Sequence, residues 1–64
     1  MDIGNRIREL RKTQGLTQEE LADRAELTKG YISQLERDMT SPSISTLEDI
    51  LQCLGTSLSE FFTS

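Results

Sequence analysis

Two helix starts lie close together in the middle of this chain, and they constrain its fold more than any other feature. At the first start, Thr17 is placed to cap a helix, and Glu20, three residues later, completes a capping box. Leu16 and Leu21 have the spacing of a hydrophobic staple, which fixes the direction in which the chain runs into the helix. A helix is therefore predicted to begin directly after Thr17.

The second helix start repeats this arrangement. Thr28 is placed to cap a helix over residues 28–37, and Leu27 stands at staple distance from Ile32. Because the first helix must end before residue 28, only a tight turn fits between the two helices. The sequence therefore predicts a pair of short helices whose relative placement is set largely by local chemistry.

At the helical period, the residues of the second helix separate into two faces. Ile32 and Leu35 lie on one face, which we expect to be buried. The opposite face carries small or hydrogen-bonding residues: Lys29, Gly30, Ser33, Gln34 and Arg37. In the major groove of DNA, Gln34 can pair with adenine, Lys29 can donate to guanine, and Gly30 lets the backbone approach closely. An ordinary solvated helix face is the alternative interpretation.

The N-terminal part predicts another helix, over about residues 2–14. Ile3, Ile7 and Leu10 recur at helical spacing and form its expected inner face, and Gly15 is suited to end it.

Pro42 predicts a break before a fourth helix, which either Ser43 or Ser45 can cap and which Gly55 ends. Its apolar residues are Leu47, Ile50, Leu51 and Leu54.

Ser57 and Glu60 have the spacing of a capping box for a short fifth helix that contains Phe61 and Phe62. The predicted fold class is all-α, a compact five-helix bundle. At 64 residues the chain has room for a single domain over residues 1–64.

The charge balance argues against a protein held on DNA by its overall field, since the net charge is −4. The distribution of charge softens this objection. All seven basic residues precede residue 40, whereas Glu48, Asp49 and Glu60 leave the C-terminal part acidic. Binding to DNA would then depend on a local patch.

The chain has no histidine and a single cysteine, Cys53. This composition predicts no metal site, no cofactor and no enzyme, because it offers neither a nucleophile–base pair nor a set of soft ligands. Cys53 falls on the apolar side of the fourth helix, so a small buried side chain is favoured over a redox sensor. Without a signal region or a membrane-spanning run, we expect a cytoplasmic protein with no membrane contact.

The chain resembles the Xre/Cro-type helix-turn-helix family of bacterial and phage repressors over nearly all of its length. The resemblance is carried by residues 7–11, 15–22, 31–37, 42–44, 54–55 and 57–62. Within this family it is most similar to regulators that join such a domain to a C-terminal cupin-type ligand-sensing barrel, and no barrel sequence is present here. The resemblance implies a lambda-repressor-like DNA-binding domain of a transcriptional regulator. It further implies a repressor of bacterial or phage origin that is associated with the nucleoid.

A domain of this kind reads one half-site, so a homodimer on a near-palindromic operator is expected. The predicted base-reading residues are Lys29, Gly30, Ser33 and Gln34. The predicted phosphate-binding residues are Thr17, Gln18, Thr28, Tyr31, Arg37, Thr40 and Ser41. For Tyr31 a packing role is the alternative. The resemblance also implies an ion pair between Arg11 and Glu36. This pair would tie the helix over about residues 2–14 to the end of the helix over residues 28–37.

Two residues depart from the family pattern. Glu26 stands in the turn between the two central helices, and Asp38 stands after the second of them, where relatives commonly have glycine. If Glu26 has positive φ, its backbone carries a strain of about 1 kcal/mol that glycine would relieve.

A protein-interaction module, such as an antitoxin-like domain with DNA binding secondary, is the alternative function. The acidic C-terminal part would suit a basic partner. Phe62 is open to two interpretations: a dimer contact, or a contact with a C-terminal domain outside this chain.

Overall fold

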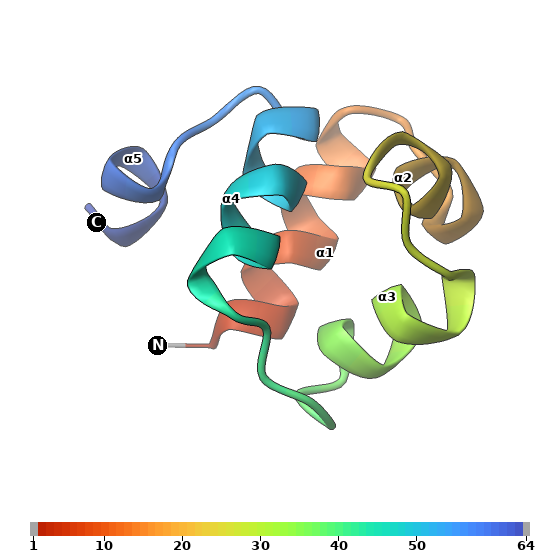
Figure 1. Cartoon of the computed structure of the whole chain (residues 1–64). Coiled ribbons are helices and arrows are strands. Elements are labelled where there is room, and N and C mark those ends of the chain that lie inside the picture. Colours follow the sequence, from red (N-terminus) through yellow and green to blue (C-terminus); the bar gives the residue numbers. More distant parts are fainter. Residues whose placement is uncertain (1, 64) are drawn as a thin grey trace.

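The computed structural model describes residues 2–63, and its regular elements in that range are five α-helices (Figure 1). They are α1 (Ile3–Thr13), α2 (Gln18–Arg24), α3 (Lys29–Glu36), α4 (Ile44–Cys53) and α5 (Leu58–Phe62). The predicted all-α class is confirmed. The pair α2 and α3 is joined by the short segment 25–28, as the two adjacent helix starts predicted.

Every helix begins after a residue whose side chain accepts a hydrogen bond from the first turn; these caps are Asp2, Thr17, Thr28, Ser43 and Ser57. The capping box of α2 is complete, because Glu20 also accepts from the Thr17 N–H at 2.9 Å. At α5 the predicted box forms only in part: the Glu60 N–H donates to Ser57, but the Glu60 carboxylate accepts from the Ser57 hydroxyl, at 3.4 Å. Of the two candidates at α4, Ser43 is the cap.

Four helices end in the same way, with a residue of positive φ just beyond the helix. Gly15 (φ 73°) and Gly55 (φ 75°) follow α1 and α4, whereas Glu26 (φ 58°) and Asp38 (φ 57°) follow α2 and α3. In each case the next N–H donates back into the last turn, as Met39 does to the Gln34 carbonyl at 2.9 Å. The two acidic residues therefore occupy backbone positions that glycine fills elsewhere in this chain.

The core is a single apolar cluster to which every helix contributes. Its buried members are Ile7, Leu16, Leu21, Ala22, Ile32, Leu35, Leu47, Ile50, Leu51, Leu54 and Phe61. Ile3, Leu10 and Cys53 pack against this cluster but are only partly buried, so the predicted inner face of α1 is centred on Ile7. Leu54 is the C-cap of α4 and still lies in the core.

The helices α2 and α3 lie on one side of α1 and α4, and α5 lies on the other (Figure 1). α3 runs along the edge of the molecule, where one of its sides contacts α1 and α2 and the other faces outward. The molecule measures 27 × 23 × 19 Å. In the described part of the chain, no helix combines the length and the apolar character that crossing a membrane would require.

Candidate nucleic-acid interface

The outward side of α3 carries the residues predicted to read bases. Ile32 and Leu35 are buried in the core, while Lys29, Gly30 and Gln34 are exposed and Ser33 is partly buried. A Cβ built on Gly30 would meet only the Thr28 hydroxyl, 4.0 Å away. The lack of a side chain at Gly30 is thus not required by internal packing, and it leaves this part of the helix backbone accessible from outside.

The start of α2 borders a surface hollow that also reaches Lys29, the first residue of α3. Thr17, Gln18 and Lys29 border this hollow of about 560 Å³, together with Arg11, Leu16, Glu19, Glu20 and Asp23. The side-chain amide of Gln18 donates to Glu36 Oε1 at 3.1 Å. Because an amide NH₂ has two hydrogens, this bond leaves one for an acceptor outside the protein. The acidic residues on the same rim oppose an anion, so only a narrow part of this hollow suits a phosphate.

Arg11 and Glu36 are brought together as the resemblance implied. Arg11 Nε donates to Glu36 Oε2 at 2.6 Å and Nη2 donates to Oε1 at 3.0 Å, which makes the pair bidentate. Arg11 Nη1 also donates to the Leu16 carbonyl at 2.8 Å. The hydrogen bond to Glu36 raises the pKa of Arg11, against the opposing effect of burial. One guanidinium thereby connects α1, the start of α2 and the end of α3.

Of the other predicted phosphate contacts, Thr17 caps α2, and the rest lie at the start of α3, along it or beyond its end. The Thr17 and Thr28 hydroxyls each accept from a first-turn N–H, at 3.0 Å. Tyr31 is partly buried and packs against the core, which favours its packing role. Arg37 is exposed, and its Nε donates back to the Ser33 carbonyl at 3.4 Å.

Thr40 and Ser41 line a smaller hollow of about 160 Å³ with Ile44 and Phe62. The structure therefore groups these two residues with an apolar surface beyond the end of α3, at the opposite end of that helix from Lys29.

Sequence reasoning missed several polar contacts that act over long sequence separations, three of them made by Gly4, Arg6 and Arg8 of α1. The Gly4 N–H donates to Asp38 Oδ1 at 3.1 Å, and Arg8 Nε lies 3.8 Å from Glu36 Oε1. Arg6 places its guanidinium 5.1 Å from the centre of the Phe61 ring. A glycine in the first turn of α1 was the only available signal for the first contact, and it does not identify a partner.

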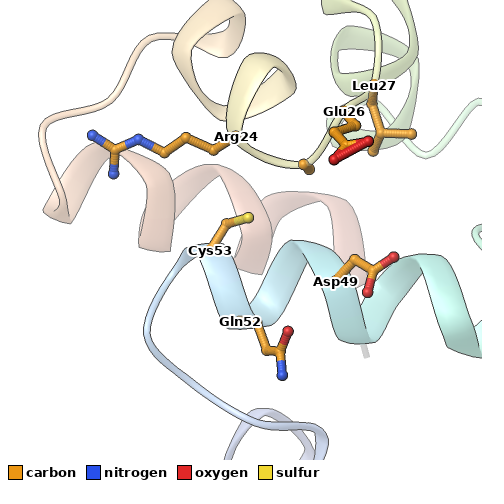
Figure 2. Close-up of a pocket in the computed structure, with 7 residues that line it drawn as sticks. Arg24, Glu26, Leu27, Asp49, Gln52 and Cys53 are labelled. Carbon is orange, nitrogen blue, oxygen red and sulfur yellow. The ribbon is translucent and has the colours of Figure 1, made fainter.

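A further hollow, of about 440 Å³, lies between the α2–α3 turn and α4 (Figure 2). Cys53 points from α4 toward the turn, and Glu26 and Leu27 border the hollow on the side of the turn (Figure 2). The Arg24 side chain extends away from the turn (Figure 2). Within residues 2–63, the His, Cys, Asp and Glu side chains form no group that could hold a metal ion. This hollow offers mixed charges around one partly buried thiol.

The fold and the outward face of α3 define a helix-turn-helix protein. The helix-turn-helix family model HTH_3 matches residues 7–61, so the chain belongs to this family. The resemblance predicted from the sequence is thereby confirmed at the level of the family.

Curated relatives carry names of regulators. The chain is 48% identical over 60 residues to the HTH-type transcriptional regulator PuuR of Escherichia coli K12, which covers 94% of this chain and 32% of PuuR. It is 44% identical to the immunity repressor protein of Bacillus phage phi105, over 92% of this chain and 41% of the repressor. The chain thus spans less than half the length of these relatives.

Solved structures of the same fold agree. The clp gene regulator ClgR of Corynebacterium glutamicum superposes with a TM-score of 0.90 at 32% identity, over 94% of this chain and 77% of ClgR. SinR, a master regulator for biofilm formation, was solved in complex with DNA. It superposes with a TM-score of 0.85 at 40% identity, over 92% of this chain and 95% of that one.

Proposed function

We propose that this chain is the sequence-specific DNA-binding part of a transcriptional regulator, a repressor, and that it reads the major groove with the outward face of α3. The observation that carries the proposal is the exposure of Lys29, Gly30 and Gln34 on a helix whose other face is fixed in the core. Relatives named as a transcriptional regulator and as an immunity repressor, and a similar structure bound to DNA, support it.

In this proposal Gln34 pairs with one base, Lys29 donates to another, and Ser33 adds a further hydrogen bond. Phosphate contacts orient the domain without reading sequence. They are assigned to Thr17, Gln18, Thr28, Tyr31, Arg37, Thr40 and Ser41. Of these, Gln18 has the best-defined geometry, because Glu36 already holds one hydrogen of its amide.

Two copies are needed to read a full operator. Successive half-sites on one side of DNA are about 34 Å apart, whereas the longest dimension of this molecule is 27 Å. A homodimer on a near-palindromic site follows, and a ligand-sensing domain C-terminal to this one would adjust its occupancy. Such a regulator works at the nucleoid.

The net charge of −4 supports weak attachment to arbitrary DNA. One of the seven basic residues, Arg11, is already paired with Glu36. Recognition would therefore depend on the groove contacts and on both copies acting together.

The test is selection of bound sequences from a random duplex pool, followed by titration. Gln34→Ala should relax preference at one base position, a loss of about 1–3 kcal/mol in discrimination. Gln18→Ala should instead weaken binding to all sequences alike. If selection returns no enriched palindromic motif, the proposal is wrong.

An antitoxin-like interaction module is the second candidate, and specific surface features favour it. Glu48, Asp49 and Glu60 are exposed, as are Met39, Ile44 and Phe62. Absence of DNA binding at low salt, with capture of a basic protein partner, would support this candidate over the first.

A further inference from the structure

The last turn of α3 lies directly on the first turn of α1. Gly4 is buried there, and a Cβ added to it would lie 2.5 Å from the Leu35 carbonyl oxygen and 2.7 Å from that of Glu36. These are backbone atoms, which cannot rotate away as the end of a flexible side chain can. Gly4 therefore permits an approach between the two helices that no other residue would allow.

Asp38 closes this contact with a hydrogen bond. It follows α3 with φ 57°, a conformation costly for residues other than glycine, asparagine and aspartate. In this conformation its carboxylate oxygen Oδ1 accepts from the Gly4 N–H at 3.1 Å. That N–H belongs to the first turn of α1, where helical N–H groups have no partner within the helix. The aspartate thus makes a contact that glycine at the same position could not make.

The end of α3 is consequently attached to α1 at two separate points. One is Asp38 with Gly4, and the other is Glu36 with Arg11. Gly4 and Arg11 are seven residues apart, which corresponds to about 10 Å along the α1 axis. The buried Ile32 and Leu35 also hold α3, and the second attachment at this end limits the pivot that these contacts leave.

We propose that Asp38 is a positioning residue for DNA reading: through Gly4 it fixes the direction of α3 relative to α1, and so the register of Gln34 and Lys29 against the base pairs. This proposal rests on the proposed function. Asp38 itself makes no contact with DNA. A shift of about 1 Å at a recognition surface is enough to lose well-aligned hydrogen bonds, so a small pivot of α3 would reduce sequence preference.

Asp38→Gly and Asp38→Asn form the matched pair that tests this. Both remove one negative charge, so both change the general attraction to DNA equally. Glycine adopts positive φ freely but has no acceptor, whereas asparagine tolerates this conformation and keeps an oxygen that can accept from the Gly4 N–H. Three measurements are made on each variant: thermal melting, affinity for the selected operator and for its single-base variants, and the orientation of α3 relative to α1 from residual dipolar couplings.

We expect Asp38→Gly to melt within a few degrees of the wild type, to bind the operator about tenfold more weakly, and to discriminate less between the operator and its single-base variants. The orientation of α3 should change with it. Asp38→Asn should keep affinity, discrimination and the orientation of α3 near their wild-type values.

Three results would overturn the proposal. Wild-type discrimination and orientation in Asp38→Gly would show that the bond positions nothing. Equal loss in both variants would show that the acceptor is not the cause. Lower melting with uniformly weaker binding but intact discrimination would indicate a purely structural role. If the wild-type protein itself selects no sequence, the proposed function fails separately, and the orientation of α3 in the two variants still decides whether Asp38 positions it.

Discussion

The two ends of α3 are held in different ways. At its last turn, Glu36 is bound by Arg11 and Gln18, and just beyond the helix Asp38 accepts from the Gly4 N–H. At its first turns, Lys29 and Gly30 are exposed, and so is Gln34 on the same face. Polar residues thus serve the fold at one end and remain available to a partner at the other. Substitutions at the two ends should separate stability from binding.

The largest expected effect is at the attached end. Glu36→Ala leaves a buried guanidinium without its partner, and removal of one member of such a pair costs about 3–5 kcal/mol. Chemical denaturation measures the loss, and DNA binding should weaken with it. Arg8→Ala is the control: its side chain is 40% exposed and 3.8 Å from the same carboxylate, so the expected change is below about 1 kcal/mol. Unchanged melting in Glu36→Ala would contradict the structural role of the pair.

A methyl group added at Gly4, which faces the last turn of α3, and one added at Gly30, in the first turn of α3, should have opposite effects on stability. Gly4→Ala forces a Cβ against two backbone oxygens, and overpacking of this kind costs about 1–3 kcal/mol. Gly30→Ala meets no close atom and lies within a helix, where alanine is favoured by up to about 1 kcal/mol. Thermal melting should therefore fall for the first variant and not for the second. Equal melting of the two variants would remove the distinction between the two ends.

The turn before α3 allows a test of backbone strain alone. Glu26 has positive φ, so Glu26→Gly should stabilise the protein by about 1 kcal/mol. Gly15→Ala is the opposing control, because it places a side chain in the same backbone conformation and should destabilise the protein. A lower melting temperature for Glu26→Gly would show that the glutamate side chain contributes more than its backbone costs.

The smallest effect concerns the cap of α2. The hydrogen bond from the Thr17 N–H lowers the pKa of Glu20 from its ordinary value. A carboxyl group with a lowered folded-state pKa stabilises the protein above its unfolded pKa of about 4.3, and this contribution is lost as the pH falls through the folded pKa. Glu20→Gln cannot titrate, so its stability should fall less between about pH 5 and pH 3. Parallel curves for both proteins would show that ionisation of Glu20 adds nothing to the stability of the capping box.

The helices could be predicted because their signals are local. Thr17, Thr28 and Ser57 cap at the expected residues, and Gly15 and Gly55 end helices as predicted. These signals act within a few residues of one another. They do not depend on how the helices pack.

The contacts between helices were harder to predict. Gly4 and Asp38 are 34 residues apart, and only tertiary packing brings them together. Their chemical types are ordinary for a first helical turn and for a chain segment after a helix. The same holds for Gln18, whose predicted contact was an external phosphate and whose amide in fact also binds Glu36. Only the Arg11–Glu36 pair was available in advance, and it came from the family resemblance.

The exposed face of α3 has a consequence for how such a protein can diversify. Its residues 29, 30 and 34 are exposed, so new side chains there leave the core and the two attachments to α1 intact. A few codon changes could then redirect the same scaffold to a different target while its folding stability stays nearly constant. Selection on what the protein recognises and selection on whether it folds would act on different parts of one short helix.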